Sequence, residues 1–342
     1  MPPLPRMNTG IFQTSIGNDL AIAADWLRQS ELVAIPTETV YGLAGNALKE
    51  ESVLKIFLAK DRPRFNPLIL HVPDIDAVKK YVLGISPVME LLMNTFSPGP
   101  ITFLLDKNPA MVSDVVTAGS SKVAVRIPAH PITQALLKQL DFPLVAPSAN
   151  RFGYVSPVTA AHVYEGLQGR IPYILDGGTC TVGVESTIVD EEDGQLIIRR
   201  TGKVSVEDIA RIAGVTPVLK THAEDHPVAP GMLKSHYATH TPLYLGKATD
   251  TSALAADKRV IVMGWGNEEA IAAAYHFPDT TILLQVISLS NDCRIDEVAS
   301  KLFASMRNAD NMGAEAILVE PFPNEGIGQA INDRLQRASV LH

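Results

Sequence analysis

The chain has 342 residues, 46% hydrophobic and 19% charged, which is the balance of a globular protein long enough for two domains. Its 29 Lys and Arg against 37 Asp and Glu give a formal net charge of −8, which argues against a protein that coats nucleic acid non-specifically. The two cysteines, Cys180 and Cys293, are too widely spaced for a disulfide framework or a cysteine-based zinc site, so we expect a reducing, cytoplasmic location. The start of the chain lacks the apolar core of a signal peptide and the apolar runs are strand-sized, so no membrane is expected.

Residues 1–212 show strands and helices in irregular alternation. Helices are expected over residues 20–27, 50–60, 75–82, 87–94, 132–140 and 206–213, and strands over 32–35, 68–72, 101–105, 123–127, 143–146, 173–175, 186–189 and 196–199. The late strands follow one another directly, which favours antiparallel pairing. We therefore predict one α/β domain, residues 1–212, around a twisted mixed sheet.

The remaining chain divides into a linker and a second domain. Residues 213–241 are rich in proline, histidine and small residues without periodicity, which predicts a linker or lid. From 242 to 342 the pattern is regular, with strands at 243–245, 260–263, 281–286 and 316–319 and helices at 268–275, 295–308 and 328–337. This alternation predicts a smaller βαβ, Rossmann-like domain with a parallel sheet.

The most unusual stretch begins where the first buried strand ends. Residues 36–43 place two threonines and Glu38 at the polar end of that strand, which suits the binding of a small polar substrate. Further on, Lys60, Arg62 and Arg64 lie within five positions beside Pro63, where a helix has to stop. Such a cluster favours an anion such as phosphate, although a single cation there could simply complement the helix C-terminus.

Other polar residues at strand ends have two readings each. Lys122 and Arg126 are four apart on one strand and so share a face, either as internal salt bridges or as a site for a carboxylate or phosphate. Ser156 with Pro157 reads as a helix start, and a helix start can also bind an anion. Residues 146–150 follow a strand and open a loop, where open sheets often contact ligands.

Several common sites are not supported by the sequence. The linker histidines His222, His226, His236 and His240 show two H-x-x-x-H spacings, but no accompanying pattern favours a metal, and none is expected. There is no P-loop, and the pairs of glycines at 264–266 and 326–328 lack the third glycine of a dinucleotide site. Residues 229–237 combine a cation and an aromatic residue and suit a lid over a site elsewhere.

Five stretches together resemble the YrdC-like threonylcarbamoyl-AMP synthases. They are P-T-E-T-V-Y-G-L at 36–43, K-x-R-P-x-x-N-P-L at 60–68, A-P-S-A-N at 146–150, S-T-I-V-D at 186–190 and P-G-M-x-x-x-H-Y at 230–237. The C-terminal domain resembles that of the longer, two-domain type. The resemblance implies that L-threonine, bicarbonate and ATP give threonylcarbamoyl-AMP and pyrophosphate, for a modification of the tRNA adenosine beside the anticodon.

The resemblance also implies roles for particular residues. Those expected to contact threonine or its carbamate are Thr39, His71, Arg126, Ala146, Ser148 and Ser186. Those expected to contact ATP are Arg62, Asn66, Lys122, Ser156, Arg200 and Tyr237. Two departures, Ala229 where serine is frequent and Thr239 where proline is frequent, fall at the expected lid.

The implied chemistry needs positioning and cations more than a nucleophilic side chain, so no catalytic residue is assigned. Mg²⁺ would accompany ATP and be held chiefly by phosphates and water. The implied partners are proteins that transfer the threonylcarbamoyl group to tRNA, while direct tRNA binding stays open.

Two rival readings remain. YrdC-like domains present a concave cationic face, so the chain could be an RNA-binding module, against which the net charge of −8 weighs. Hydrogenase-maturation proteins contain a similar domain, but they carry cysteine clusters and an acylphosphatase portion that this chain lacks.

Overall fold

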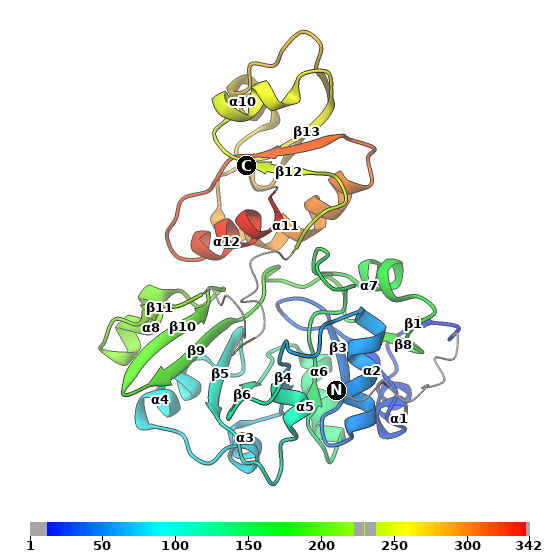
Figure 1. Cartoon of the computed structure of the whole chain (residues 1–342), viewed down its shortest axis with the longest axis vertical. Coiled ribbons are helices and arrows are strands. Elements are labelled where there is room, and N and C mark those ends of the chain that lie inside the picture. Colours follow the sequence, from blue (N-terminus) through cyan, green and yellow to red (C-terminus); the bar gives the residue numbers. More distant parts are fainter. Residues whose placement is uncertain (1–11, 222–228, 230–236, 340–342) are drawn as a thin grey trace.

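The chain folds around two separate sheets. A computed structural model describes residues 12–221, 229 and 237–339. Figure 1 shows the larger sheet with its helices below and the smaller sheet with its helices above. The sheets have 11 and 4 strands, respectively. The α/β class and the two-domain arrangement predicted from the sequence are therefore confirmed.

The larger sheet is mixed. Its order is β1-β8-β2-β3-β7-β4-β6-β5-β9-β10-β11, with parallel pairs such as β4–β6 and antiparallel pairs such as β9–β10. The strands are β1 (Ser15–Gly17), β2 (Val33–Ile35), β3 (Gly42–Asn46), β4 (Ile69–His71), β5 (Ile101–Asp106), β6 (Lys122–Arg126), β7 (Leu144–Val145), β8 (Tyr173–Leu175), β9 (Thr187–Glu192), β10 (Gln195–Arg200) and β11 (Val218–Leu219). The strand β11 pairs with β10 and lies within the stretch expected to be a linker.

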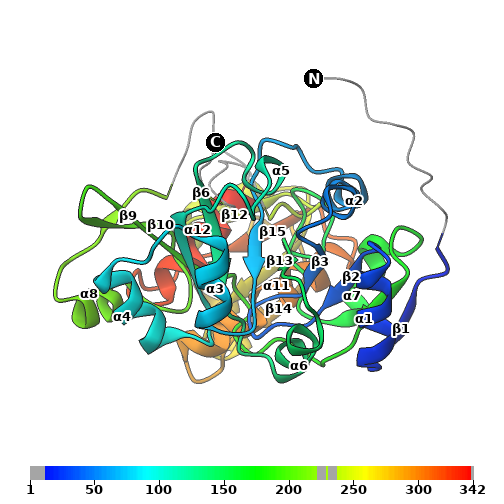
Figure 2. The same ribbon diagram turned by 90° about the horizontal axis from the view of Figure 1, so that it is seen from below.

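Helices pack on this sheet through their apolar faces. They are α1 (Leu20–Arg28), α2 (Glu50–Lys60), α3 (Ile75–Tyr81), α4 (Pro87–Phe96), α5 (Asp114–Thr117), α6 (Pro131–Gln139), α7 (Ala160–Leu167) and α8 (Val206–Ala213). In Figure 2, seen from below, α3 and α4 lie in front and the C-terminal domain behind, so these helices cover the sheet face that points away from that domain. Capping follows local chemistry: Asp19 caps α1 and Ser205 caps α8 through backbone N–H groups.

The smaller sheet is entirely parallel, as predicted, with the order β12-β15-β13-β14. Its elements are β12 (Leu243–Leu245), α9 (Ala248–Thr251), the 3₁₀ helix η1 (Ser252–Ala255), β13 (Arg259–Gly264), α10 (Glu268–Ala274), β14 (Ile282–Ser288), α11 (Ile295–Asp310), β15 (Ala316–Val319) and α12 (Gly328–Ala338). One face packs on α9, η1 and α10, and the other packs on α11 and α12, which lie toward the larger sheet (Figure 1).

The two domains share a packed interface. Arg307 of α11 donates to the Val155 carbonyl at 2.6 Å, and Lys203 pairs with Asp296 at 2.5 Å. Gly183 lies so close to α11 that a β-carbon there would be 2.3 Å from the Ala299 carbonyl oxygen. Apolar side chains of both domains belong to one buried cluster, so the C-terminal domain is part of the same packed core.

One local prediction was wrong. Helix α7 begins at Ala160 with Thr159 as its N-cap, so Ser156 and Pro157 do not start the helix. Both Ser156 and Thr159 are good capping residues, and the choice depends on a distant contact, because the Ser156 hydroxyl instead donates to Glu185 at 2.6 Å. Within residues 12–221, 229 and 237–339, no helix has both the length and the apolar character needed to cross a membrane.

Candidate functional site

A cavity opens on the larger sheet. Its lining comes from the ends of several strands and from the linker, and consists of Thr37, Val40, Gly42, Arg62, Ile69, His71, Arg126, Ala146, Pro147, Ser148, Glu185, Arg200 and Tyr237. Six residues predicted to bind substrates therefore line one cavity from distant parts of the chain, together with Tyr237 of the expected lid.

The loop after β2 is held by its own hydroxyl groups. The Thr37 hydroxyl donates to the Val40 carbonyl at 2.6 Å and accepts from the backbone N–H groups of Thr39 and Val40. Thr39 is fully buried, with its hydroxyl 2.8 Å from that of Thr37. Beside it, Glu38 accepts from Arg126 at 2.6 Å and from the Ala129 N–H at 3.1 Å. This network fixes the cavity wall.

His71 is a neutral acceptor at the cavity. Burial, followed by the charge of Arg126, lowers the pKa of His71 to about 3, so the ring is uncharged at neutral pH. Its Nδ1 lies 3.0 Å from the Ile69 carbonyl oxygen, which can only accept, so Nδ1 carries the proton. The Nε2 atom is then left as an acceptor for a ligand hydroxyl or ammonium group.

The three cations at and just after the end of α2, Lys60, Arg62 and Arg64, differ in their surroundings. Lys60 is buried, and its Nζ donates to the carbonyls of Ser148 and Asn150, each at 2.5 Å. It therefore clamps the loop after β7. Arg62 lines the cavity and donates to the Pro67 carbonyl at 2.9 Å, while Arg64 is half-exposed.

Arg200 anchors the opposite wall. It donates to the carbonyl of Ser186 at 2.9 Å and to its hydroxyl at 3.0 Å, and that hydroxyl lies 2.7 Å from the hydroxyl of Thr102. Burial lowers the pKa of Arg62 to about 9 and that of Arg200 to about 10, so both stay charged at neutral pH. With Arg126, they give the cavity three guanidinium groups and a strong preference for anions.

The C-terminal domain contributes to this cavity, which the sequence did not indicate. Glu185 accepts from Ser156 and from Arg334 of α12, whose Nε lies 3.1 Å from Oε2. Arg334 is fully buried, and its guanidinium carbon stands 5.6 Å from the centre of the Tyr237 ring. That ring stacks on Phe303 of α11 at 5.5 Å. Two helices of the second domain thus hold two lining residues of the first cavity.

Asn66 also fits a binding role. It is 1% exposed, and both polar atoms of its side-chain amide are buried without a hydrogen-bond partner in the described chain. A buried amide with no partner is costly, so such a group in a native fold calls for an explanation, and a bound ligand is one.

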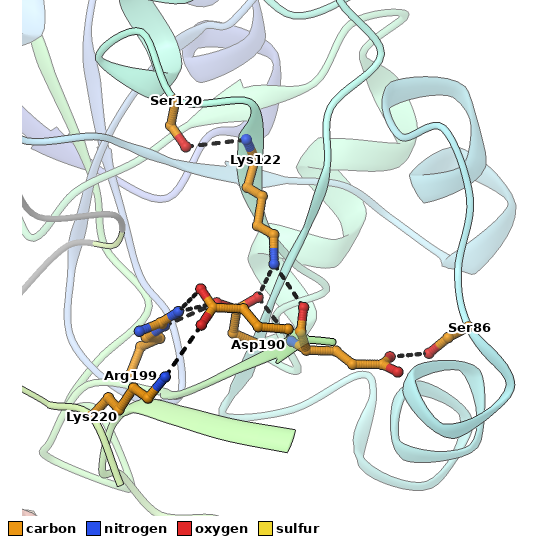
Figure 3. A network of polar contacts seen from close by, with 8 residues as sticks. Ser86, Ser120, Lys122, Asp190, Arg199 and Lys220 are labelled. Carbon is orange, nitrogen blue, oxygen red and sulfur yellow. Dashed lines mark hydrogen bonds and ion pairs between the residues drawn. The ribbon is translucent and has the colours of Figure 1, made fainter. Parts of the chain in front are cut away.

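Lys122 is not among the lining residues. Its ammonium group pairs with Asp190 at 2.5 Å, as drawn in Figure 3, and donates to the Glu191 carbonyl at 2.8 Å. Arg199 shares the same carboxylate at 2.7 Å. The internal salt bridge, one of the two readings of Lys122, is thus present, as it is for Arg126 with Glu38.

The expected lid is described only in part. His222, His226 and His236 lie outside the described residues, while His240 is bound to Asp310 at 2.8 Å. Ala229 is buried against apolar side chains on the cavity face of the sheet. In the described ranges, no three His, Cys, Asp or Glu side chains are grouped as they would be around a metal ion.

Comparison with known proteins gives the family. A family model described as "Telomere recombination", for Sua5, YciO and YrdC proteins, matches residues 25–202, and one described as "Threonylcarbamoyl-AMP synthase, C-terminal domain" matches residues 204–340. Threonylcarbamoyl-AMP synthase of Pyrococcus abyssi is 36% identical, with 94% of each chain covered. The Bacillus subtilis protein of the same name is also 36% identical, with 94% of this chain and 92% of that protein covered.

Solved structures agree with these relatives. The crystal structure of P. abyssi Sua5 complexed with L-threonine has a TM-score of 0.84 and 33% identity, covering 97% of this chain and 100% of that chain. A double variant of the same protein has a TM-score of 0.86 and 34% identity, covering 95% of this chain and 96% of that one. The shared fold extends over both domains, and the chain belongs to the threonylcarbamoyl-AMP synthase family.

Proposed function

We propose that the chain is an L-threonylcarbamoyladenylate synthase, which converts L-threonine, bicarbonate and ATP into threonylcarbamoyl-AMP and pyrophosphate. The observation that carries this proposal is one cavity lined by Arg62, Arg126 and Arg200 together with the neutral His71. Such a site offers cations for a triphosphate and a carboxylate, and a neutral acceptor for a hydroxyl or ammonium group.

We expect the substrates to divide along the cavity. Threonine or its carbamate would contact Thr39, His71, Arg126, Ala146, Ser148 and Ser186. ATP would contact Arg62, Asn66, Ser156, Arg200 and Tyr237. Lys122 would reach the nucleotide only by releasing Asp190, which makes it the assignment with the least support from the geometry.

The reaction needs placement rather than a covalent enzyme intermediate. The amine of threonine and bicarbonate give a carbamate and water, and a carbamate oxygen then attacks the α-phosphorus as the bond to pyrophosphate breaks. Arg62 and Arg200 would stabilise the charge that develops on the phosphates, since both are buried and fixed before the substrates arrive. The product hydrolyses readily, so exclusion of water by the closed cavity would protect it.

Mg²⁺ would enter with ATP. Among the described lining residues the carboxylate is Glu185, and it is already bound to Ser156 and Arg334. The residues therefore suit an ion held chiefly by phosphate oxygens and water, whose chemistry is to offset phosphate charge. The product would pass to proteins that modify the tRNA adenosine beside the anticodon.

Pyrophosphate release tests the function. With ATP and bicarbonate, we expect release with threonine, and roughly 10–200-fold lower kcat/KM with serine, which lacks one methyl group. Valine lacks the hydroxyl and should be discriminated by about 10⁴-fold if a buried partner reads that group. Release that is unchanged without threonine or bicarbonate would contradict the proposal, and RNA affinity across a salt series would then test the rival reading.

A further inference from the structure

A second cavity is lined entirely by residues of the C-terminal domain. It opens where the parallel strands end, between the residue after β13, Trp265, and the residues after β15, Glu320 to Phe322. Ligands of open parallel sheets bind outside the carboxyl ends of the strands, at the point where the connections diverge.

The connections diverge at this point. After β13 the chain turns to α10, on the face covered by α9 and η1, whereas after β15 it turns to α12, on the opposite face. The neighbouring strands β13 and β15 therefore send their helices to different sides of the sheet (Figure 1). The cavity occupies the crevice that this divergence creates.

Tyr275 forms part of the cavity wall. It is 7% exposed, and its hydroxyl lies beside the side chain of Thr251. The Thr251 hydroxyl donates to the Lys247 carbonyl at 3.2 Å, so side chains of the same domain hold this part of the wall.

Two opposite charges also line the cavity without pairing with each other. The Ala248 N–H donates to Oε1 of Glu320 at 2.9 Å. In the described structure, no ion pair joins the Glu320 carboxylate to the ammonium group of Lys247. Lys247 is exposed at the rim. An apolar part of the same lining contains Trp265 and Phe322, whose rings meet edge-to-face with centroids 5.7 Å apart.

The residues that line the second cavity favour one class of ligand over others. A dinucleotide or other polyphosphate would need a glycine-rich turn and several donors, but the turn at 264–266 lacks the third glycine and is followed by Glu268 and Glu269. One lysine and one glutamate in the lining match a zwitterion. We propose that this cavity binds an α-amino acid with an apolar side chain, its ammonium group on Glu320, its carboxylate on Lys247, and its side chain against Trp265 and Phe322.

This inference goes beyond the proposed function and does not depend on it, because the two cavities share no lining residue. It can therefore be tested on the intact protein without nucleotide. Isothermal titration calorimetry of the full chain with each of the nineteen amino acids other than threonine, paired with thermal unfolding scans, should detect binding of apolar amino acids. Threonine is omitted because the first cavity is expected to bind it.

Two variants and a control locate the binding. Glu320→Gln and Lys247→Met should each weaken the affinity tenfold or more. Glu325→Gln, which removes the same charge from an exposed position in the same domain, should leave it unchanged. Binding that survives Glu320→Gln, no binding by any of the nineteen amino acids at millimolar concentration, or binding of adenosine alone would each overturn the proposal.

Discussion

Arg62 and Arg64 are two positions apart but differ in what surrounds them. Arg62 is buried at the cavity, and Arg64 is half-exposed, with no side-chain hydrogen bond or ion pair to the described residues. Arg62→Ala should raise the KM for ATP at least tenfold, because a buried charged hydrogen bond contributes about 1.5–3 kcal/mol. Arg64→Ala is the matched control and should stay within about twofold of the parent. Equal effects in steady-state pyrophosphate assays would contradict the assignment of Arg62.

His71 gives the fold a dependence on pH. Its folded pKa of about 3 lies below the ordinary value of 6.5, so the unfolded chain binds the proton first as the pH falls. Stability from this group is complete above pH 6.5 and is lost between that value and about pH 3. Because of His71, the free energy of unfolding should fall by about 2 kcal/mol between pH 7 and pH 5.

Urea unfolding at these two pH values checks this. His71→Gln should lose less stability on acidification than the parent by about that amount. Burial lowers the pKa of His162 to about 4, so His162 should contribute a second, separable part of the pH dependence of stability. An unchanged pH dependence in His71→Gln would mean that the ring is not buried in its neutral form.

Among the elements, those with strong local signals could be predicted from the sequence. Helix α2 begins and ends where expected, at Glu50 and Lys60, since two acids start it and Pro63 follows it. Strand β3 was missed because Gly-Leu-Ala-Gly-Asn lacks the β-branched and aromatic residues typical of strands. Its pairing with β2 and β7 stabilises it instead, and no local pattern reports such contacts.

Site residues that depend on distant contacts were also hard to predict from the sequence. His71, Arg126 and Arg200 were expected from the resemblance to the family, and each also stands at the end of a recognisable strand. Arg334 could not, because its helix shows a regular amphipathic pattern and its partner Glu185 is 149 residues away in sequence. Asp190, the partner of Lys122, could not be predicted either. Lys122 lies on β6 and Asp190 on β9, and these strands come near each other only because β9 pairs with β5.

Helix α12 acts on the cavity through one residue. Arg334→Ala should leave Glu185 without its buried cation, costing about 3–5 kcal/mol of stability. If Arg334 positions Glu185 and Tyr237, the folded variant should also show a KM for ATP raised about tenfold, with a smaller change for threonine. Gln336→Ala, at an exposed position of the same helix, is the control. A loss of stability with unchanged KM values would make Arg334 merely structural.

In the whole molecule, the two domains approach each other so closely at Gly183 that a side chain there has no room. The φ of Gly183 is +80°, and a β-carbon would be 2.3 Å from the Ala299 carbonyl oxygen of α11. Gly178 has nearly the same φ, +79°, but open space around its β-carbon position, so Gly178→Ala measures backbone strain alone. Gly183→Ala should cost about 1–3 kcal/mol more, because the backbone of α11 has to move.

Calorimetric unfolding separates the two variants. Gly178→Ala should unfold in one transition like the parent, at a lower temperature. Gly183→Ala should loosen the interface and divide the unfolding into two transitions, one for each domain. A single transition at the same temperature for both variants would show that the contact with α11 does not hold the domains together.

The bond between Glu185 and Arg334 also has a consequence for how the protein is made. Ribosomes add about 5–20 residues per second, so the 149 residues that separate the two partners take roughly 7–30 s to synthesise. During that interval the strands around the first cavity can already pair, while Glu185 still lacks its arginine. The nascent chain would therefore carry an unfinished cavity until its last helix leaves the ribosome, and a product truncated before α12 would fold its larger sheet without completing the site.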